Sequence, residues 1–160
     1  MKTKGFSLVE TLVVISIIGV MSSIITPKVS IYLAKAKDTK VIADLSTLRM
    51  ASQMYYLDQG KALGEENGEI KTYLTNADLE KIKIYITGSI DVLQEETNGE
   101  VTEEIGGSRD EENGKIKLGG KIKYTFKNEF LNSDDGVNLW LKKDNGVGDY
   151  TINNYKWEEL

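Results

Sequence analysis

The feature that most constrains this chain is an apolar run that begins at Phe6 and ends at Ile25. The polar residues among its twenty positions are Ser7, Glu10, Thr11, Ser16, Ser22 and Ser23. As an α-helix this run would be about 30 Å long, which is enough to cross the hydrocarbon core of a bilayer. The sequence therefore predicts a membrane-spanning helix near the N-terminus.

One carboxylate, that of Glu10, interrupts the apolar run. At mid-membrane it would cost roughly 2.5–3.5 kcal/mol on the insertion scale, and less near the edge, so its presence predicts a function and a partner. Lys2, Lys4 and Gly5 stand just before Phe6. A protease that cuts after the small residue would free the α-amine of Phe6, which is mostly protonated because its usual pKa is about 7.7–8.0.

Within one chain a rigid helix is expected to point this amine away from Glu10. In a neighbouring helix that is shifted along its axis, the amine and the carboxylate can meet and neutralise each other. Helices packed side by side in a filament would supply that arrangement. The charge pattern therefore predicts an assembly contact between copies of the chain.

The stretch from Lys4 to Glu10 resembles the cleavage and methylation signature of type IV prepilins and of the related pseudopilins. The resemblance implies cleavage between Gly5 and Phe6 by a prepilin peptidase on the cytoplasmic side, and N-methylation of Phe6 by the same enzyme. It also implies that Glu10 is the acid used in assembly. The motif is short, but its positions are strict.

Two further residues, Gly19 and Pro27, fall where this family carries residues that weaken the helix. The resemblance is close over residues 4–27, and beyond them it covers only the general plan of a helix followed by a sheet. It implies a leader peptide at residues 1–5, a transmembrane and polymerisation helix at 6–27, and a globular domain at 28–160.

Two other interpretations of the N-terminus compete with this one. A secretory signal peptide also begins with lysines and an apolar run, and Val20-Met21-Ser22 could be its cleavage site. Its apolar segment is usually only about 7–15 residues long, however, and Glu10 interrupts the start of the run seen here. The second alternative is a plain signal anchor whose Glu10 reaches the cytoplasmic interface.

The net charge of −5 is unevenly distributed. Residues 1–40 hold six lysines against two acids, a charge of +4, so the remaining 120 residues sum to −9. A basic leader beside an acidic exported domain agrees with an N-terminus that stays in the cytoplasm. The acidic balance argues against nucleic-acid binding through a broad basic face.

The chain contains no cysteine and no histidine. No disulfide can therefore stabilise an extracellular fold; many pilins of Gram-negative bacteria have one, and its absence points weakly to a Gram-positive source. Without histidine the chain lacks the commonest general base and the commonest zinc ligand. No nucleophile motif is present either, so a membrane-anchored enzyme is disfavoured, and no cofactor or metal is predicted.

After Pro27 the pattern becomes amphipathic without an intervening loop. One helix face is predicted to contain Val41, Leu45, Leu48, Ser52 and Tyr55. The other faces can hold Lys35, Lys37, Lys40, Asp44 and Arg49. Pro27 should kink this helix rather than end it, and Gly60 should stop it. The sequence thus predicts one helix from residue 6 to about residue 59, whose apolar face serves filament packing or, from Leu45 onward, the core of the globular domain.

The middle of the chain predicts short elements. Residues 60–68 indicate a loop, Thr75 or Asn76 is a candidate helix cap, and residues 83–87 indicate a short strand. Residues 95–113 carry eight acids against Arg109 and predict a solvated loop or a loose hairpin. A cation site or a glycosidase-like acid pair on this tract is disfavoured, because a flexible segment cannot hold either geometry.

The C-terminal part predicts antiparallel strands. Residues 115–118 and 121–126 should pair through a two-residue turn at Gly119-Gly120, and one face of this pair should hold Ile116, Leu118, Ile122, Tyr124 and Phe126. Residues 137–141 should form a strand whose Trp140 points outward, where it is either covered by the C-terminal segment or exposed for contact. Residues 144–149 indicate a turn, where calcium is a minor alternative. Residues 150–160 should form a last strand or close over the sheet.

Together these features predict an α+β subunit in which a long N-terminal helix packs on a small antiparallel sheet. The function indicated is that of a structural subunit, a major pilin of a type IV pilus, with a pseudopilin of a secretion or DNA-uptake system as the alternative. The expected partners are other copies of the chain, the prepilin peptidase, and the pilus assembly platform with its ATPase machinery. The subunit is expected in the cytoplasmic membrane before assembly and in a cell-surface filament afterwards.

Overall fold

The structure is a computed structural model that describes residues 7–87, 93–95, 98–129 and 131–160. The described residues fall into two compact units, which divide between Leu33 and Ala34. Helix α1 (Leu8–Gln59) passes through both, with Pro27 inside it. Gly60, with a φ of +67°, ends the helix and donates its N–H to the Tyr56 carbonyl oxygen at 2.8 Å. The single long helix expected from the sequence is confirmed over the described residues.

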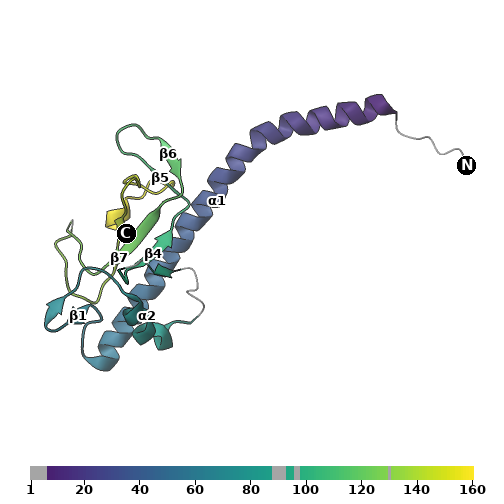
Figure 1. The fold of residues 1–160 in the computed structure, drawn as a ribbon. Helices are drawn as coiled ribbons and strands as arrows, with labels where there is room; N and C mark the ends of the chain where they lie inside the picture. Colours follow the sequence, from purple (N-terminus) through teal and green to yellow (C-terminus); the bar gives the residue numbers. More distant parts are fainter. Residues whose placement is uncertain (1–6, 88–92, 96–97, 130) are drawn as a thin grey trace, which may run out of the picture. The chain divides into compact units, whose positions relative to one another are not determined.

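The second unit contains all the remaining elements of Figure 1. They are β1 (Glu65–Glu66), β2 (Glu69–Ile70), α2 (Asn76–Ile82), η1 (Lys83–Tyr85), β3 (Gln94–Glu95), β4 (Val101–Glu104), β5 (Gly107–Arg109), β6 (Ile116–Leu118), β7 (Lys121–Thr125), β8 (Trp140–Lys143) and η2 (Trp157–Glu159). The largest sheet is antiparallel, in the order β3-β4-β7-β8, and two smaller ones pair β1 with β2 and β5 with β6. The predicted α+β class is confirmed.

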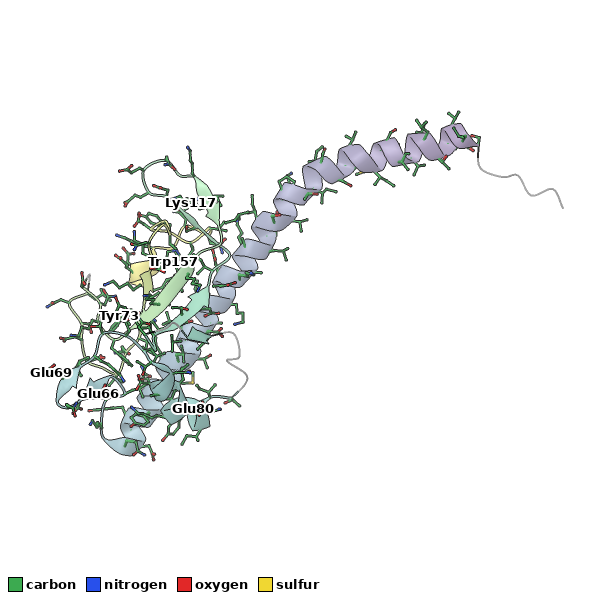
Figure 2. The ribbon with its side chains drawn as sticks, in the orientation of Figure 1. Glu66, Glu69, Tyr73, Glu80, Lys117 and Trp157 are labelled. Atoms are coloured by element: carbon green, nitrogen blue, oxygen red, sulfur yellow. The ribbon has the colours of Figure 1, made fainter. Side chains whose placement is uncertain are left out.

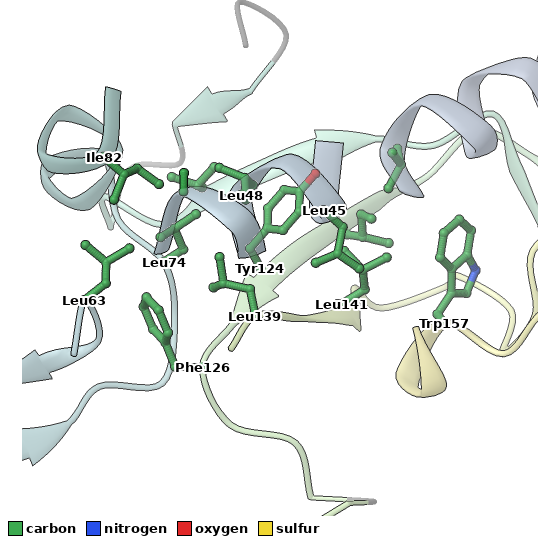
Figure 3. Close-up of a cluster of buried hydrophobic side chains, with 14 of the residues drawn as sticks. Leu45, Leu48, Leu63, Leu74, Ile82, Tyr124, Phe126, Leu139, Leu141 and Trp157 are labelled. Carbon is green, nitrogen blue, oxygen red and sulfur yellow. The ribbon is translucent and has the colours of Figure 1, made fainter. Parts of the chain in front are cut away.

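The apolar face of α1 packs on the large sheet. Val41, Leu45 and Leu48 are at most 1% exposed, and the Ser52 side chain is buried beside them. Figure 3 shows the leucines of α1 facing Tyr124 from β7 and Leu141 from β8. This face therefore forms the core of the globular unit, as expected from Leu45 onward.

Three predictions about short elements are confirmed. Thr75 is the N-cap of α2, where its N–H and its hydroxyl both donate to Asp78 Oδ2, at 3.1 and 2.6 Å. Residues 144–149 form a turn in which the Val147 N–H donates to the Asp144 carbonyl oxygen. The C-terminal segment closes over the fold and buries Trp157 completely.

Other predictions were wrong. Residues 83–85 form a 3₁₀ turn rather than a strand, because they continue α2 without a break. The expected hairpin between residues 115–118 and 121–126 does not form: β6 pairs with β5, and β7 pairs with β4 and β8. Ile116 and Leu118 consequently stay exposed instead of joining the core. For Trp140 two possibilities were open, covered or exposed, and the structure shows the first, since its side chain is only 7% exposed.

The prediction for the acidic tract, a solvated loop or a loose hairpin, was only partly right: β3 pairs antiparallel with β4 and β5 with β6, but residues of β4 are buried and not solvated. Glu103, on β4, is 1% exposed and accepts hydrogen bonds from the Tyr124 hydroxyl and from Lys40 Nζ. Lys40 also pairs with Asp44, at 2.5 Å. These partners, distant in sequence, allow one glutamate of the tract to enter the interior.

Burial raises the pKa of the Glu103 carboxyl, the Tyr124 hydrogen bond lowers it, and the Asp44 charge raises it, with a net increase. A carboxyl whose pKa is raised in the folded state stabilises the fold most when protonated, and this stability is lost as pH rises through the folded pKa. We therefore expect the free energy of unfolding to fall less between pH 5 and pH 7 in Glu103→Gln than in the wild type, because the amide cannot ionise. Urea titrations at pH 5 and pH 7 measure this, and an equal fall in both proteins would contradict it.

Candidate functional site

The candidate site is the first turn of α1, where Ser7 and Glu10 bond to each other. The Ser7 N–H donates to Glu10 Oε2 at 2.7 Å, and the Glu10 N–H donates to Ser7 Oγ at 3.3 Å. This reciprocal pair is a capping box, which satisfies N–H groups that a helix start leaves without an intrahelical partner. The Glu10 carboxylate therefore has a partner in its own chain.

The sequence predicted a partner for Glu10 only in a neighbouring chain, and the structure adds one within the same chain. Gly5 and Phe6, the predicted cleavage and methylation residues, lie outside the described residues. The Glu10 carboxylate folds back to the residue that follows Phe6, and so does not point away from its own N-terminal turn. Sequence reasoning missed the role of Ser7, although a serine followed three residues later by a glutamate is the signature of a capping box.

The helix surface that follows is apolar and uncovered within the chain. None of the described side chains from Ser7 to Ser30 is buried, and Figure 2 shows them standing out from α1. Leu8, Ile15 and Val20 are 79%, 66% and 64% exposed. By length and composition this part of α1 can cross a membrane. A continuous apolar helix surface of this kind is stable only when lipid or other protein covers it.

Gly19 and Pro27 lie on this surface. A Cβ at Gly19 would meet no atom within 4 Å, so packing inside this chain does not require glycine there. Pro27 has no N–H to give to the Ser23 carbonyl oxygen. The nearby hydroxyls of Ser23 and Thr26 donate to the carbonyl oxygens of Val20 and Ser22 instead. The helix nevertheless continues through Pro27.

A second polar site fixes α1 to the rest of the globular unit. Asp38 is fully buried, and its Oδ1 accepts the N–H groups of Gly106 and Gly107 at 2.9 and 3.2 Å. Its Oδ2 accepts the N–H of Ile152 at 3.2 Å. Burial raises the pKa of this carboxyl above its ordinary value, although the three hydrogen bonds oppose the shift. Asp38 lies three residues before Val41, so the 3-4 spacing of the buried face could have revealed it.

Arg49 lies outside the apolar face of α1, as expected, and is half-buried. Its Nε donates to the Leu139 carbonyl oxygen at 2.6 Å, and its Nη2 donates to the backbone oxygen of Leu160. Burial lowers the pKa of its guanidinium. The guanidinium of Arg49 therefore connects α1 to two segments that are far away in sequence.

The described residues contain no group of three or more acids, histidines or cysteines that could hold a metal ion. In the loop considered for calcium, Asp149 pairs with Lys143, and Asp144 Oδ1 accepts the Asn145 N–H at 2.9 Å. An open groove of about 520 Å³ lies beside Lys37, Gly120 and Lys121, and no nucleophile with an adjacent base lines it.

Comparisons with known proteins agree with the N-terminal features. Residues 1–26 match the family model described as the prokaryotic N-terminal methylation motif. The chain is 39% identical to the type II secretion system core protein G of Klebsiella pneumoniae over 67 residues. These residues are 42% of this chain and 48% of that protein. It is 36% identical over 62 residues to the type IV major fimbrial protein FimA of Dichelobacter nodosus, 39% of each chain.

The chain spans less than half the length of these curated relatives. No solved structure matches it. Over its N-terminal part the chain is therefore similar to type IV fimbrial proteins and to type II secretion system core protein G, and this part continues into an α+β globular unit.

Proposed function

We propose that this chain is the structural subunit, a major pilin, of a type IV pilus that polymerises through the apolar first half of α1. The observation that carries the proposal is the uncovered apolar surface that begins directly after a methylation motif and continues into a folded unit with its own core. Lipid would cover this surface before assembly, and the helices of neighbouring copies would cover it afterwards.

In this proposal residues 1–5 are a leader that prepilin peptidase removes, and Phe6 becomes the N-methylated first residue. Residues 6–27 form the membrane and polymerisation helix, and residues 28–160 form the globular domain. The N-terminus is in the cytoplasm before assembly. Further partners are the assembly platform and its ATPase machinery, and the finished filament lies on the cell surface.

The contact between copies would pair the Phe6 amine of one subunit with Glu10 of the next. In the free subunit the Ser7 N–H satisfies the Glu10 carboxylate, so assembly exchanges a bond within one chain for an ion pair between chains. Gly19 and Pro27 are the proposed flexible points of this helix. Gly costs about 1 kcal/mol relative to Ala in a helix, and Pro27 removes one backbone hydrogen bond.

The second candidate function is that of a pseudopilin in a type II secretion or DNA-uptake system. The similarity to secretion system core protein G supports it as directly as the fimbrial relatives support the first. Shearing of cells followed by electron microscopy distinguishes the two, because only a pilus releases long surface filaments. Adhesion, twitching motility and biofilm formation are the roles proposed for such a filament.

The test of processing uses Gly5→Leu. A bulky side chain should block a peptidase that accepts a small residue, so we expect a membrane-bound chain that keeps its five leader residues, is unmethylated and forms no filaments. Mass spectrometry of the purified chain measures this, with the wild type as control. A wild-type mature chain that begins at Ser23 instead of methylated Phe6 would contradict the proposed function.

A further inference from the structure

Four Asn–Gly pairs occur in this chain, beginning at Asn67, Asn98, Asn113 and Asn145. In every pair the glycine has a positive φ, between +63° and +86°, which places the pair in a tight turn. Asn67 and Gly68 form the two-residue connection of the β1–β2 hairpin, and Glu66 and Glu69 beside them are labelled in Figure 2. Asn145 and Gly146 lie in the turn after β8.

Asn–Gly pairs can lose ammonia without an enzyme. The glycine backbone nitrogen attacks the asparagine Cγ, the N–Cγ bond forms, and the Cγ–Nδ2 bond breaks. The proton of the attacking N–H leaves with the amide as ammonia, which gives a cyclic imide. One water then opens either carbonyl of the imide to yield aspartate or isoaspartate. Glycine permits this attack because it has no side chain that shields its nitrogen.

The pairs differ in whether the glycine N–H, whose nitrogen must attack, already donates a hydrogen bond. The Gly114 N–H donates to the Asp110 carbonyl oxygen at 3.0 Å, and Asn113 Oδ1 accepts the Lys115 N–H at 2.9 Å. Attack at Asn113 therefore requires at least one hydrogen bond to break. Among the described residues no acceptor engages the N–H of Gly68 or of Gly146. Asn98 adjoins residues outside the described ranges, so the contrast rests on the other three pairs.

We propose that Asn67 and Asn145 are sites of spontaneous deamidation, whereas Asn113 is protected by its turn. Conversion of both sites changes the net charge from −5 to −7. At Asn67 the new carboxylate joins Glu66 and Glu69, which already face each other across the hairpin. Glu66 and Glu69 are like charges directly opposite each other, which weakens a strand pair, and a third carboxylate in the turn beside them adds to this repulsion, so deamidation loosens this hairpin as the protein ages.

The test incubates the purified full chain, folded in a mild detergent, at mildly alkaline pH in ¹⁸O-labelled water. Peptide mapping then follows ¹⁸O incorporation at each asparagine. We expect Asn113 to react about tenfold more slowly than Asn67 and Asn145, a factor that corresponds to about 1.4 kcal/mol. Asn154 is the internal control, because the Tyr155 that follows it hinders attack by its side chain and its N–H donates to Thr151 Oγ1 at 3.0 Å, so Asn154 should react slowly in the folded chain and, through the side chain, also in urea.

A parallel incubation in concentrated urea shows whether structure causes the difference. Unfolding breaks the bond between Gly114 and Asp110, so the rate at Asn113 should rise to that at Asn67. Equal rates of ¹⁸O incorporation at Asn67, Asn113 and Asn145 in the folded chain would overturn the proposal. So would a slow Asn113 that stays slow in urea, because the sequence and not the turn would then protect it.

Discussion

Glu10→Val is expected to abolish filament assembly while membrane insertion and leader cleavage persist. Insertion becomes easier, because a charged group leaves the apolar run. Assembly loses the proposed partner of the Phe6 amine, which must then be buried uncompensated among neighbouring helices. Removing one member of a buried ion pair typically costs about 3–5 kcal/mol. Since about 1.4 kcal/mol is a factor of ten, each subunit addition weakens at least about a hundredfold.

The capping box supplies a matched control for this experiment. Ser7→Ala removes the side-chain bond to the Glu10 N–H but keeps both the Glu10 carboxylate and the Ser7 N–H. This substitution should lower the local stability of the helix by about 0.5–2 kcal/mol, and the variant should still assemble. Glu10→Asp keeps the charge with a shorter reach, and weak assembly is expected.

Immunoblots of membrane and sheared fractions measure all three variants. Normal surface filaments from Glu10→Val would refute the pairing with the Phe6 amine. Loss of filaments in Ser7→Ala as well as in Glu10→Val would instead assign the effect of Glu10 to helix capping. A wild type that releases no filaments would count against the pilus itself and favour the pseudopilin alternative.

The helix could be predicted from the sequence because its signals are local. The apolar run, the 3-4 spacing of Val41, Leu45 and Leu48, and the stop at Gly60 depend only on residues a few positions apart. The buried alternation of Ile122 and Tyr124 on β7 is equally local, and it was also predicted correctly.

Strand pairing could not be predicted in the same way, because it depends on contacts between distant residues. The turn at Gly119-Gly120 suggested a hairpin, yet β4 from the acidic tract takes the place beside β7. The sequence pattern around Glu103 favours solvent, and only Tyr124 and Lys40, which are far away in the chain, make its burial tolerable. In the candidate site, the Ser7–Glu10 pair was accessible to sequence reasoning and was overlooked.

Asp38→Ala should cause the largest loss of stability in the globular unit. It removes the acceptor of three N–H groups, from Gly106, Gly107 and Ile152, all of which the structure places in a buried environment. A buried donor without a partner costs about 1–3 kcal/mol. We therefore expect the free energy of unfolding to fall by about 3–9 kcal/mol, a large part of the roughly 5–15 kcal/mol that is usual for a domain.

A small backbone movement cannot easily give these three N–H groups new acceptors. A Cβ on Gly106 would lie 2.0 Å from the Ala34 carbonyl oxygen, so the loop already contacts the helix backbone as closely as glycine permits. Asp38→Asn should be milder, because its oxygen can still accept from Gly106 and Gly107. Its NH₂ group would then face the Ile152 N–H, and one donor would remain without a partner.

Urea unfolding of the full chain in a mild detergent measures these effects. The two tryptophans, Trp140 and Trp157, are both buried in the globular unit and report its unfolding by fluorescence. Asp44→Ala is the matched control on the same helix, since Asp44 is partly exposed and pairs with Lys40; we expect a loss below about 1 kcal/mol. Equal losses for Asp38→Ala and Asp44→Ala would show that the three hydrogen bonds do not hold the sheet and the C-terminal segment on α1. The expected order of stability, with Asp38→Ala lowest, Asp38→Asn intermediate and the wild type highest, would show that they do.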